Sequence, residues 1–427
     1  MTESTDRKSK ELTRRSLLKG GLTLGAGLGL STPLIAKAAT PDPLITDIQD
    51  WNRYLGDGVD ANPYGKPSAF ESHVVRRDVP WLTADAKSSV NFTPLHELEG
   101  IITPNGLCFE RHHGGVTQIE PSDHRLMING LVDTPLVFSM EDLKRFPREN
   151  HVYFLECAAN SGMEWRGSQL NGCQFTHGMV HNVMYTGIRL KHVLEEAGLK
   201  TNAKWLLPEG ADPAHMTRSI PMEKALDDCL LAFAMNGEAL RPEQGYPLRL
   251  VVPGWEGNMW VKWLRRIEVG DKAWHHREET SKYTDLLADG NARRFTWTMD
   301  TKSVITNPSP QSPITHGRGH TVLTGVAWSG HGKIKRVDVS VDGGRNWKTA
   351  RLDGPSLSKS IHRFYHEFDW DGGELFLQSR AIDEFGQVQP TKDALRAARG
   401  ENSIYHNNGI QTWHVRGDGS AENVEVS

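Results

Sequence analysis

The stretch with the clearest chemical potential is Phe154-Leu155-Glu156-Cys157-Ala158-Ala159-Asn160-Ser161-Gly162. The hydrophobic run 151–155 predicts a buried strand, and the Asn-Ser-Gly sequence that follows predicts a turn. A cysteine at the end of a strand, followed by small residues, can be approached closely by a ligand. Thiolate is a soft donor that binds transition metals and also acts as a nucleophile. The alternative is a small buried thiol without chemistry.

Two further stretches have residues that could bind an anion. An apolar strand end at 107–110 is expected to deliver the Arg-His-His sequence 111–113 into a glycine loop. The backbone N–H groups of such a loop could receive a phosphate, although a solvated turn is the alternative. Arg249 stands inside an apolar run, where a guanidinium fork needs a strong anionic partner. Lys262 follows among tryptophans and also suits an anionic ligand.

Strands and short helices are expected to position these stretches. Hydrophobic periodicity predicts strands at 125–132 and 230–235, the second followed by an Asn-Gly hairpin turn. Helices are predicted after the capping residue Ser139, over 186–198 and over 221–228. The buried face of the helix over 186–198 is expected to consist of Leu190, Val193, Leu194 and Ala197.

The pattern changes after residue 290. Short alternating strands, separated by Asp-Gly-Gly turns, are predicted at 322–328, 334–341, 364–370 and 375–382. This spacing is typical of an Ig-like antiparallel β-sandwich. A chain of 427 residues is too long for one ordinary domain. We therefore expect an extended arm over 39–94, a main domain over 95–285 and a sandwich domain over 290–420.

The N-terminus has the composition of an export signal. Paired arginines, Arg14 and Arg15, precede a weakly hydrophobic Gly/Leu/Ala run and an Ala-Lys-Ala cleavage sequence. This pattern predicts a twin-arginine (Tat) signal over 1–38 and a periplasmic protein exported after folding. The glycines and the short apolar run argue against the alternative of a membrane anchor. No other segment could span a bilayer, so we expect no membrane partner.

Composition limits the cofactors and partners further. The formal net charge is −4, and the absence of a basic excess argues against a nucleic-acid partner. An oxidising compartment would allow two disulfides. No C-x-x-C-H sequence is present, so no covalently attached haem is expected in this chain. The four cysteines are Cys108, Cys157, Cys173 and Cys229.

Four separated motifs resemble the sulfite oxidase family of molybdenum enzymes over residues 95–415. The first two are Phe109-Glu110-Arg111-His112-His113 (family F-x-R-N-H) and Leu155-Glu156-Cys157-Ala158-Ala159-Asn160 (family L-Q-C-A-G-N). The third is Asn236-Gly237 followed by Gly245-Tyr246-Pro247-Leu248-Arg249-Leu250-Val251-Val252-Pro253-Gly254. The fourth, Trp328-Ser329-Gly330 with residues 337–344, is similar to the family's C-terminal dimerisation domain. The resemblance implies an α+β sulfite-oxidase-type molybdopterin domain followed by an all-β Ig-like sandwich domain.

The resemblance also implies a molybdenum–molybdopterin cofactor whose metal is bound by the Cys157 thiolate. Its implied catalytic residues are Cys157, Arg111, Tyr283 and Tyr185, where Tyr185 stands in place of a family tryptophan. The family has histidines at the positions of Gln244 and Trp260. Residues implied to bind the cofactor are Phe109, Glu110, Arg111, His112, His113, Cys157, Asp212, Gln244, Arg249, Trp260, Val261 and Lys262.

Departures from the family pattern bear on the substrate. Gly162 and Asn408 stand where family members that oxidise free sulfite have arginines. Their loss weakens dianion binding, because a hydrogen bond to a charged group contributes ~1.5–3 kcal/mol. The glycine also opens space. These features resemble the molybdenum subunits of sulfane dehydrogenases, which oxidise sulfane sulfur held on a carrier protein's cysteine and work beside a cytochrome c subunit.

The implied reaction is oxygen-atom transfer to sulfur at molybdenum, with electrons passing to a c-type cytochrome on another chain. The implied partners are that cytochrome, a sulfur-carrier protein and a second copy bound through the C-terminal domain, or a hetero-oligomer. Two alternatives stay open. A sulfite dehydrogenase would need Arg166, Arg189 or another cation to refill the pocket, whereas a non-catalytic subunit would only dock a cytochrome or carrier.

Overall fold

The computed structural model describes residues 49–426 except 57, 60, 62–63 and 84. The predicted export signal over 1–38 lies outside the described residues. The chain divides into two compact units, residues 1–67 and 68–427. The described part of the first unit contains one short 3-10 helix, Asp50–Asn52. The second unit contains the sites discussed below and is described by itself.

The first sheet of the second unit ends at the predicted chemical centre. Its strands follow the order β10-β9-β6-β5, β11 also pairs with β9, and every pairing is antiparallel. As predicted, β5 is a strand, and it ends one residue before Cys157. The bounds are β5 Arg148–Glu156, β6 Val180–Arg189, β9 Leu230–Met235, β10 Glu238–Ala239 and β11 Arg249–Val251.

A second five-stranded sheet follows the order β4-β3-β12-β7-β8, in which only the β3–β12 pairing is parallel. Its strands are β3 Arg125–Gly130, β4 Leu136–Ser139, β7 Trp205–Gly210, β8 Ile220–Pro221 and β12 Leu264–Gly270. A short pair, β1 Arg77–Asp78 and β2 Asn91–Phe92, precedes both sheets. The helices of this region are α2 Met140–Leu143, α3 Cys173–His177, α4 Leu190–Ala197 and α5 Met222–Asp227.

The helices agree with the sequence except at one boundary. Ser139 caps α2, with the Asp142 side chain completing a capping box, as its position predicts. The prediction that the next helix starts at residue 186 was wrong, because residues 186–189 continue β6 and pair with β9. Ladder hydrogen bonds there outweigh the helical hydrophobic spacing. The four predicted apolar positions of α4 are nevertheless all buried.

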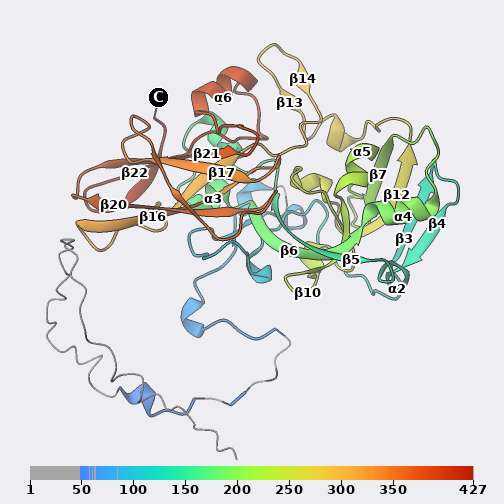
Figure 1. The fold of residues 1–427 in the computed structure, drawn as a ribbon, viewed down its shortest axis with the longest axis horizontal. Helices are drawn as coiled ribbons and strands as arrows, with labels where there is room; N and C mark the ends of the chain where they lie inside the picture. The colour runs from blue at the N-terminus through green and yellow to red at the C-terminus, as the bar shows by residue number, and fades with distance from the viewer. Residues whose placement is uncertain (1–48, 57, 60, 62–63, 84, 427) are drawn as a thin grey trace, which may run out of the picture. The chain divides into compact units, whose positions relative to one another are not determined.

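The C-terminal strands form two antiparallel sheets, shown in orange and red in Figure 1. One sheet has the order β15-β16-β20-β19, and the other β18-β17-β21-β22-β23. The strands are β15 Lys302–Asn307, β16 Gly319–Trp328, β17 Ile334–Ser340, β18 Lys348–Thr349, β19 Arg351–Asp353, β20 His362–Trp370, β21 Leu375–Asp383, β22 Thr412–Val415 and β23 Ala421–Val424. Helix α6, Lys392–Arg399, and the hairpin β13 Asp285–Leu286 with β14 Ala292–Arg293 complete the fold. The predicted sandwich is confirmed.

Two hydrophobic cores divide the second unit, and β5 contributes to both. Leu155 packs in the core of the first two sheets, whereas Phe154 belongs to the sandwich core. The rings of Phe154 and Trp328 lie 6.5 Å apart. Full burial of such a side chain stabilises a fold by about 1.5–3 kcal/mol. The strand that leads to Cys157 is therefore anchored in both domains. Among the helices that the structure describes, none is both long and apolar enough to cross a membrane.

Candidate functional site

Cys157 lies where two cavities meet. Its backbone N–H donates to Met179 O at 3.0 Å, and its carbonyl accepts from Asn160 N at 2.9 Å, so the residue begins a tight turn. Cys157 lines a first cavity of about 690 Å³ and also a second, larger one of about 1580 Å³, and both volumes include space that is open to solvent. A soft thiol donor is thus placed at the boundary of two cavities, either of which could hold a ligand.

The first cavity brings together residues that are far apart in the sequence. Of the residues predicted to act in catalysis or cofactor binding, only Tyr185 does not line it. Those that do are Phe109, Glu110, Arg111, His112, His113, Cys157, Asp212, Gln244, Arg249, Trp260, Val261, Lys262 and Tyr283.

The segment that leads to Arg111 is not the predicted strand. It is a 3-10 turn, η5 Asn105–Leu107, followed by a loop. Side chains of residues 91 and 93 supply the hydrogen bonds that a neighbouring β-strand would otherwise make to this backbone. Thr93 Oγ1 accepts from Phe109 N at 3.0 Å, and Asn91 Oδ1 accepts from Glu110 N at 2.6 Å. These bonds fix the loop that presents the side chains of residues 109–113 to the cavity.

Arg249 is a buried cation that suits an anionic ligand. Its Nη1 donates to Gln244 O at 3.1 Å and its Nη2 to Trp260 O at 3.3 Å, whereas its Nε has no hydrogen-bond partner. Among the residues that the structure describes, no carboxylate pairs with it. Burial lowers the pKa of this guanidinium. A buried charge with a free N–H at a cavity wall points to an anion as its natural partner.

Lys262 extends the same positive wall. Its Nζ lies 2.9 Å from His112 Nδ1 and donates to Glu243 O at 2.9 Å. Burial, and then the charge of Arg249, lower the pKa of Lys262 to about 7. His112 Nε2 lies 2.8 Å from Glu110 Oε2, and the hydrogen bond from His112 together with the Arg76 ion pair holds the pKa of Glu110 low against the effect of burial.

His113 and Tyr283 form the part of the wall shared by both cavities. His113 Nε2 lies 2.9 Å from the Tyr283 hydroxyl. Burial, and then the charge of Arg111, lower the pKa of His113 to about 3. Burial, and then Cys157, raise the pKa of Tyr283. Both side chains are therefore neutral near pH 7 and can donate or accept hydrogen bonds beside the Arg111 cation.

The remaining predicted residues shape the cavity. Asp212 is buried, and its Oδ1 accepts from Met216 N at 3.3 Å. Gln244 Nε2 donates to Phe109 O at 3.1 Å, which ties two parts of the wall together. Trp260 Nε1 donates to Trp255 O at 2.9 Å, so the indole presents its ring rather than its N–H.

Sequence reasoning missed other residues in this wall. Asn258 lines the cavity with an unpartnered Nδ2, and His181 lines it with an unpartnered Nδ1. Asn258 is near Lys262 in the sequence, which is a signal that could have included it. His181 lies inside the apolar strand β6, where the sequence has no feature that separates it from a core histidine.

The second cavity differs from the sequence expectation in three places. Tyr185 is fully buried behind the first cavity and packs on Trp260 with ring centroids 5.6 Å apart, so it does not face a substrate. Asn408 also does not line the cavity, because its side chain donates to Thr301 O at 3.2 Å. Gly162 does line it, but a Cβ there would lie 2.5 Å from Ile404 O, so the chain passing at residue 404 leaves no room for a side chain.

The cations suggested to refill this pocket are also elsewhere. Arg189 donates to Glu149 Oε2 at 2.7 Å, and Arg166 is exposed outside both cavities. Two residues with no motif to mark them, Arg277 and Lys282, line the second cavity together with Glu164 and Glu278. The charges are therefore mixed. Apolar side chains make up much of the remaining wall, including Leu82, Val90, Phe92, Met163, Leu170, Phe175, Met179 and Ile404.

The arrangement suits a ligand that combines anionic groups with a soft metal. The first cavity offers buried cationic and amide N–H donors, two of them unpartnered, and Cys157 supplies one thiol at its edge, whose pKa is raised by burial and which would bind a metal in its deprotonated form. All four cysteines are free thiols in the structure, and the other three are buried. The disulfides that the sequence would allow are not formed among them.

Comparison with known proteins assigns a family to this geometry. Residues 113–278 match the model of the oxidoreductase molybdopterin binding domain, and residues 293–413 that of the Mo-co oxidoreductase dimerisation domain. Sulfite oxidase of Gallus gallus is 33% identical over 340 residues, which is 73% of each chain. Mitochondrial sulfite oxidase of Homo sapiens is 33% identical over 338 residues, and the chain spans 62% of its length.

A solved structure extends the match over nearly the whole chain. The crystal structure of the sulfane dehydrogenase SoxCD from Paracoccus pantotrophus is similar with a TM-score of 0.90 and 63% identity, covering 91% of this chain and 100% of that one. The predicted molybdopterin domain followed by a sandwich is confirmed. The cavity, the two domains and these relatives lead to one conclusion: the chain belongs to the sulfite oxidase family of molybdopterin oxidoreductases.

Proposed function

We propose that this chain is the molybdenum-bearing subunit of a periplasmic sulfane dehydrogenase, which oxidises sulfane sulfur carried on a partner protein's cysteine. In this proposal its electrons pass to a c-type cytochrome on a separate chain, and no haem is bound here. The 63% identity to a chain of a sulfane dehydrogenase supports this substrate class over free sulfite. The export signal predicted over 1–38 supports a periplasmic location.

The residues of the first cavity fit a molybdopterin. The free Nε of Arg249 and Nδ2 of Asn258 are buried donors without partners, and a pterin with its phosphate offers the acceptors they lack. Lys262 would contribute a further donor, and the Cys157 thiolate would bind the metal. When bound, the cofactor supplies oxygen-atom transfer and two-electron redox chemistry.

This chain's own residues would bind and orient the substrate. Arg111, His113 and Tyr283 line both cavities together with Cys157, so a group that enters the second cavity reaches all four side chains at the same boundary. Arg111 offers a charged donor for the oxyanion that develops on sulfur. Neutral His113 and Tyr283 can hold that oxygen without adding charge.

The width and lining of the second cavity are the observation that carries the proposal. A space of about 1580 Å³, part of it open to solvent, with many apolar side chains in its wall is larger than a free oxyanion needs, and it could admit a peptide arm. Gly162 is part of this wall, where the close chain at residue 404 keeps the position free of a cation. Both features favour a sulfur atom presented on a protein segment.

Oxidation of free sulfite is the second candidate. Arg277 and Lys282 line the second cavity and could attract a dianion, and sulfite oxidases are 33% identical to this chain. Glu164 and Glu278 in the same wall are paired with Lys392 and with Arg277, so the Arg277 charge is already offset by a carboxylate and attracts a dianion less strongly. We rank this candidate lower for that reason.

Oligomer formation is part of the proposal. The match of residues 293–413 to a dimerisation domain supports contact with a second copy or with a partner chain through the sandwich. The sulfur carrier and the cytochrome would approach the second cavity, since it leads to the proposed metal ligand.

The test compares substrates on molybdenum-loaded protein with cytochrome c as acceptor. One assay would supply free sulfite, and another a small carrier protein bearing a cysteine persulfide. We expect kcat/KM to be at least about a hundredfold higher for the persulfide, equivalent to about 2.7 kcal/mol of preference. The same carrier without sulfane sulfur is the control. Faster turnover of free sulfite than of the persulfide would contradict the proposal.

A further inference from the structure

Glu156, the residue immediately before Cys157, is a fully buried carboxylate held by the other domain. Its Oε1 accepts from Lys302 Nζ at 2.9 Å and its Oε2 from Trp328 Nε1 at 2.6 Å. Lys302 belongs to β15 and Trp328 to β16 of the C-terminal sandwich. If Lys302 moved away, Glu156 would be left as an unpaired buried charge, which is strongly destabilising. Glu156 and Lys302 therefore fix each other's positions.

The same lysine also reaches the far side of the turn that bears the thiol. Lys302 Nζ donates to Asn160 O at 3.3 Å, and Asn160 Nδ2 donates to Glu156 Oε1 at 2.9 Å. Asn160 Oδ1 in turn accepts from Met179 N at 3.1 Å, while Met179 O accepts from Cys157 N. Cys157 therefore lies inside a closed set of hydrogen bonds with Lys302 at its centre.

We propose that Lys302 is a positioning residue for the Cys157 sulfur, acting through Glu156 before it and Asn160 after it. The C-terminal sandwich thereby sets where the metal-binding thiolate stands, in addition to any role in dimerisation. Residues 156 and 302 are 146 positions apart, so the ligand geometry depends on the docking of one domain on the other. A displacement of the sulfur would alter both the metal's surroundings and the rate of the reaction.

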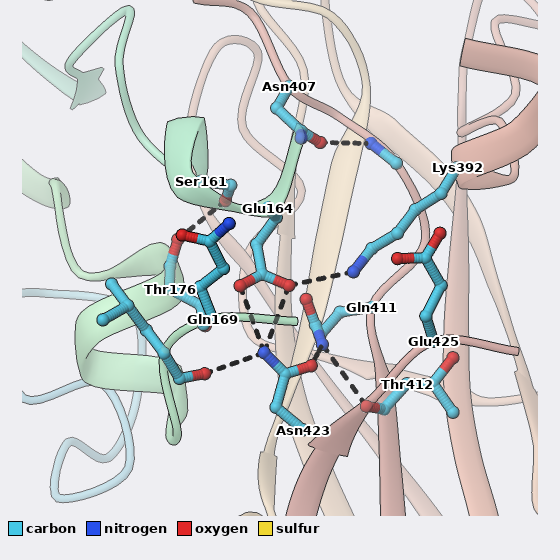
Figure 2. A network of polar contacts seen from close by, with 12 residues as sticks. Ser161, Glu164, Gln169, Thr176, Lys392, Asn407, Gln411, Thr412, Asn423 and Glu425 are labelled. Carbon is cyan, nitrogen blue, oxygen red and sulfur yellow. Dashed lines mark hydrogen bonds and ion pairs between the residues drawn. The ribbon is translucent and has the colours of Figure 1, made fainter. Parts of the chain in front are cut away.

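A second buried pair across the same boundary provides a matched control. Glu164 Oε2 accepts from Lys392 Nζ at 2.9 Å, and Asn423 Nδ2 donates to both oxygens of Glu164 at 3.1 Å. Figure 2 shows this carboxylate directed at Lys392 and Asn423. Glu164 lines the second cavity, and Lys392 donates to Glu164 rather than to the turn at 157–160. The two pairs match in chemistry and burial but differ in their relation to Cys157.

The test replaces each pair with neutral side chains of similar size in the full-length holoenzyme. Glu156→Gln with Lys302→Met removes both charges and leaves an amide whose single carbonyl oxygen can still accept from Trp328 Nε1 or from Asn160 Nδ2. Glu164→Gln with Lys392→Met is the control. The readouts are molybdenum per chain, the electron paramagnetic resonance signal of molybdenum after partial reduction with dithionite, and kcat and KM for the preferred substrate.

We expect the Glu156/Lys302 variant to shift the g values of the molybdenum signal and to lower kcat by about tenfold to a hundredfold, with little change in KM, as a displacement of about 1 Å would. The control variant should keep the wild-type g values; its KM is not part of the comparison, because Glu164 lines the second cavity. Wild-type g values and kcat in the Glu156/Lys302 variant, or equal shifts in both variants, would overturn the proposal. If the double variant does not fold, Lys302→Arg keeps the charge but moves the donor atoms, and a wild-type signal in that variant would also overturn it.

Discussion

His113 Nε2 lies 2.9 Å from the hydroxyl oxygen of Tyr283, and both side chains line the wall that the two cavities share. The Tyr283 ring is fixed by Tyr405, with centroids 5.1 Å apart, and by Arg218, whose guanidinium lies 5.2 Å from its centre. The hydroxyl is thus held at the boundary of the two cavities. This placement predicts that it hydrogen-bonds the substrate.

Tyr283→Phe should lower kcat/KM by about tenfold to a hundredfold, because a hydrogen bond to a charged oxygen contributes ~1.5–3 kcal/mol. Steady-state kinetics normalised to molybdenum content would measure the loss. Tyr365→Phe, in the sandwich strand β20 and outside both cavities, is the control. A Tyr283→Phe enzyme with wild-type kcat/KM would show that this hydroxyl does not contact the substrate.

The low pKa of His113 predicts acid sensitivity. Burial and the Arg111 charge lower this pKa to about 3 from 6.5, so the unfolded chain binds a proton below about pH 6.5 that the folded chain does not. The free energy of unfolding should therefore decrease as the pH falls from 6.5 toward 3, by up to about 1.4 kcal/mol per pH unit for this group. Denaturant unfolding of cofactor-free protein at pH 7 and pH 5 would measure it.

His113→Asn should make that pH dependence shallower, since the titrating group is gone. The exposed His320 provides the comparison, as His320→Asn should leave the steep dependence in place. Equal slopes for wild type and His113→Asn would contradict the assignment.

Arg249→Met should separate cofactor binding from folding. A buried cation without an acidic partner costs stability in the cofactor-free protein, so the substitution should leave the free energy of unfolding unchanged or raise it. Cofactor affinity should fall at least about tenfold, because one charge-assisted contact of ~1.5–3 kcal/mol is lost. Molybdenum content and thermal unfolding would measure the two effects.

The matched control for this substitution is Arg416→Met, which removes an exposed ion pair with Glu422. It should change neither molybdenum content nor thermal unfolding by much. Full molybdenum content in Arg249→Met would show that the guanidinium does not hold the cofactor.

Local patterns predicted the strand before Cys157, the capped helix at Ser139 and the sandwich, because each depends on neighbours in the sequence. Motifs also identified residues that meet in the first cavity, including Arg111, Arg249 and Lys262. Roles inferred by matching positions to the family pattern were less accurate where a distant part of the backbone occupies the space around a residue. Gly162 is glycine because residue 404 passes close to it, and Asn408 turns away to Thr301.

Contacts between distant residues were beyond sequence reasoning. Arg277 and Lys282 enter the second cavity from a stretch without regular periodicity, so no pattern marked them. The pairing of Glu156 with Lys302 depends on how two domains dock, which neither residue's neighbours reveal. Tyr185 was placed beside the substrate by analogy, but it is buried behind Trp260 because β6 points it into the core.

Molybdenum binding by Cys157 underlies the proposed function, and elemental analysis of purified protein measures it. We expect about one molybdenum per chain in wild type and loss of the metal, with loss of activity, in Cys157→Ser. Cys229→Ser, a buried thiol outside both cavities, should keep the metal. Wild-type protein without molybdenum, or Cys157→Ser with full metal content and activity, would show that Cys157 does not bind the metal.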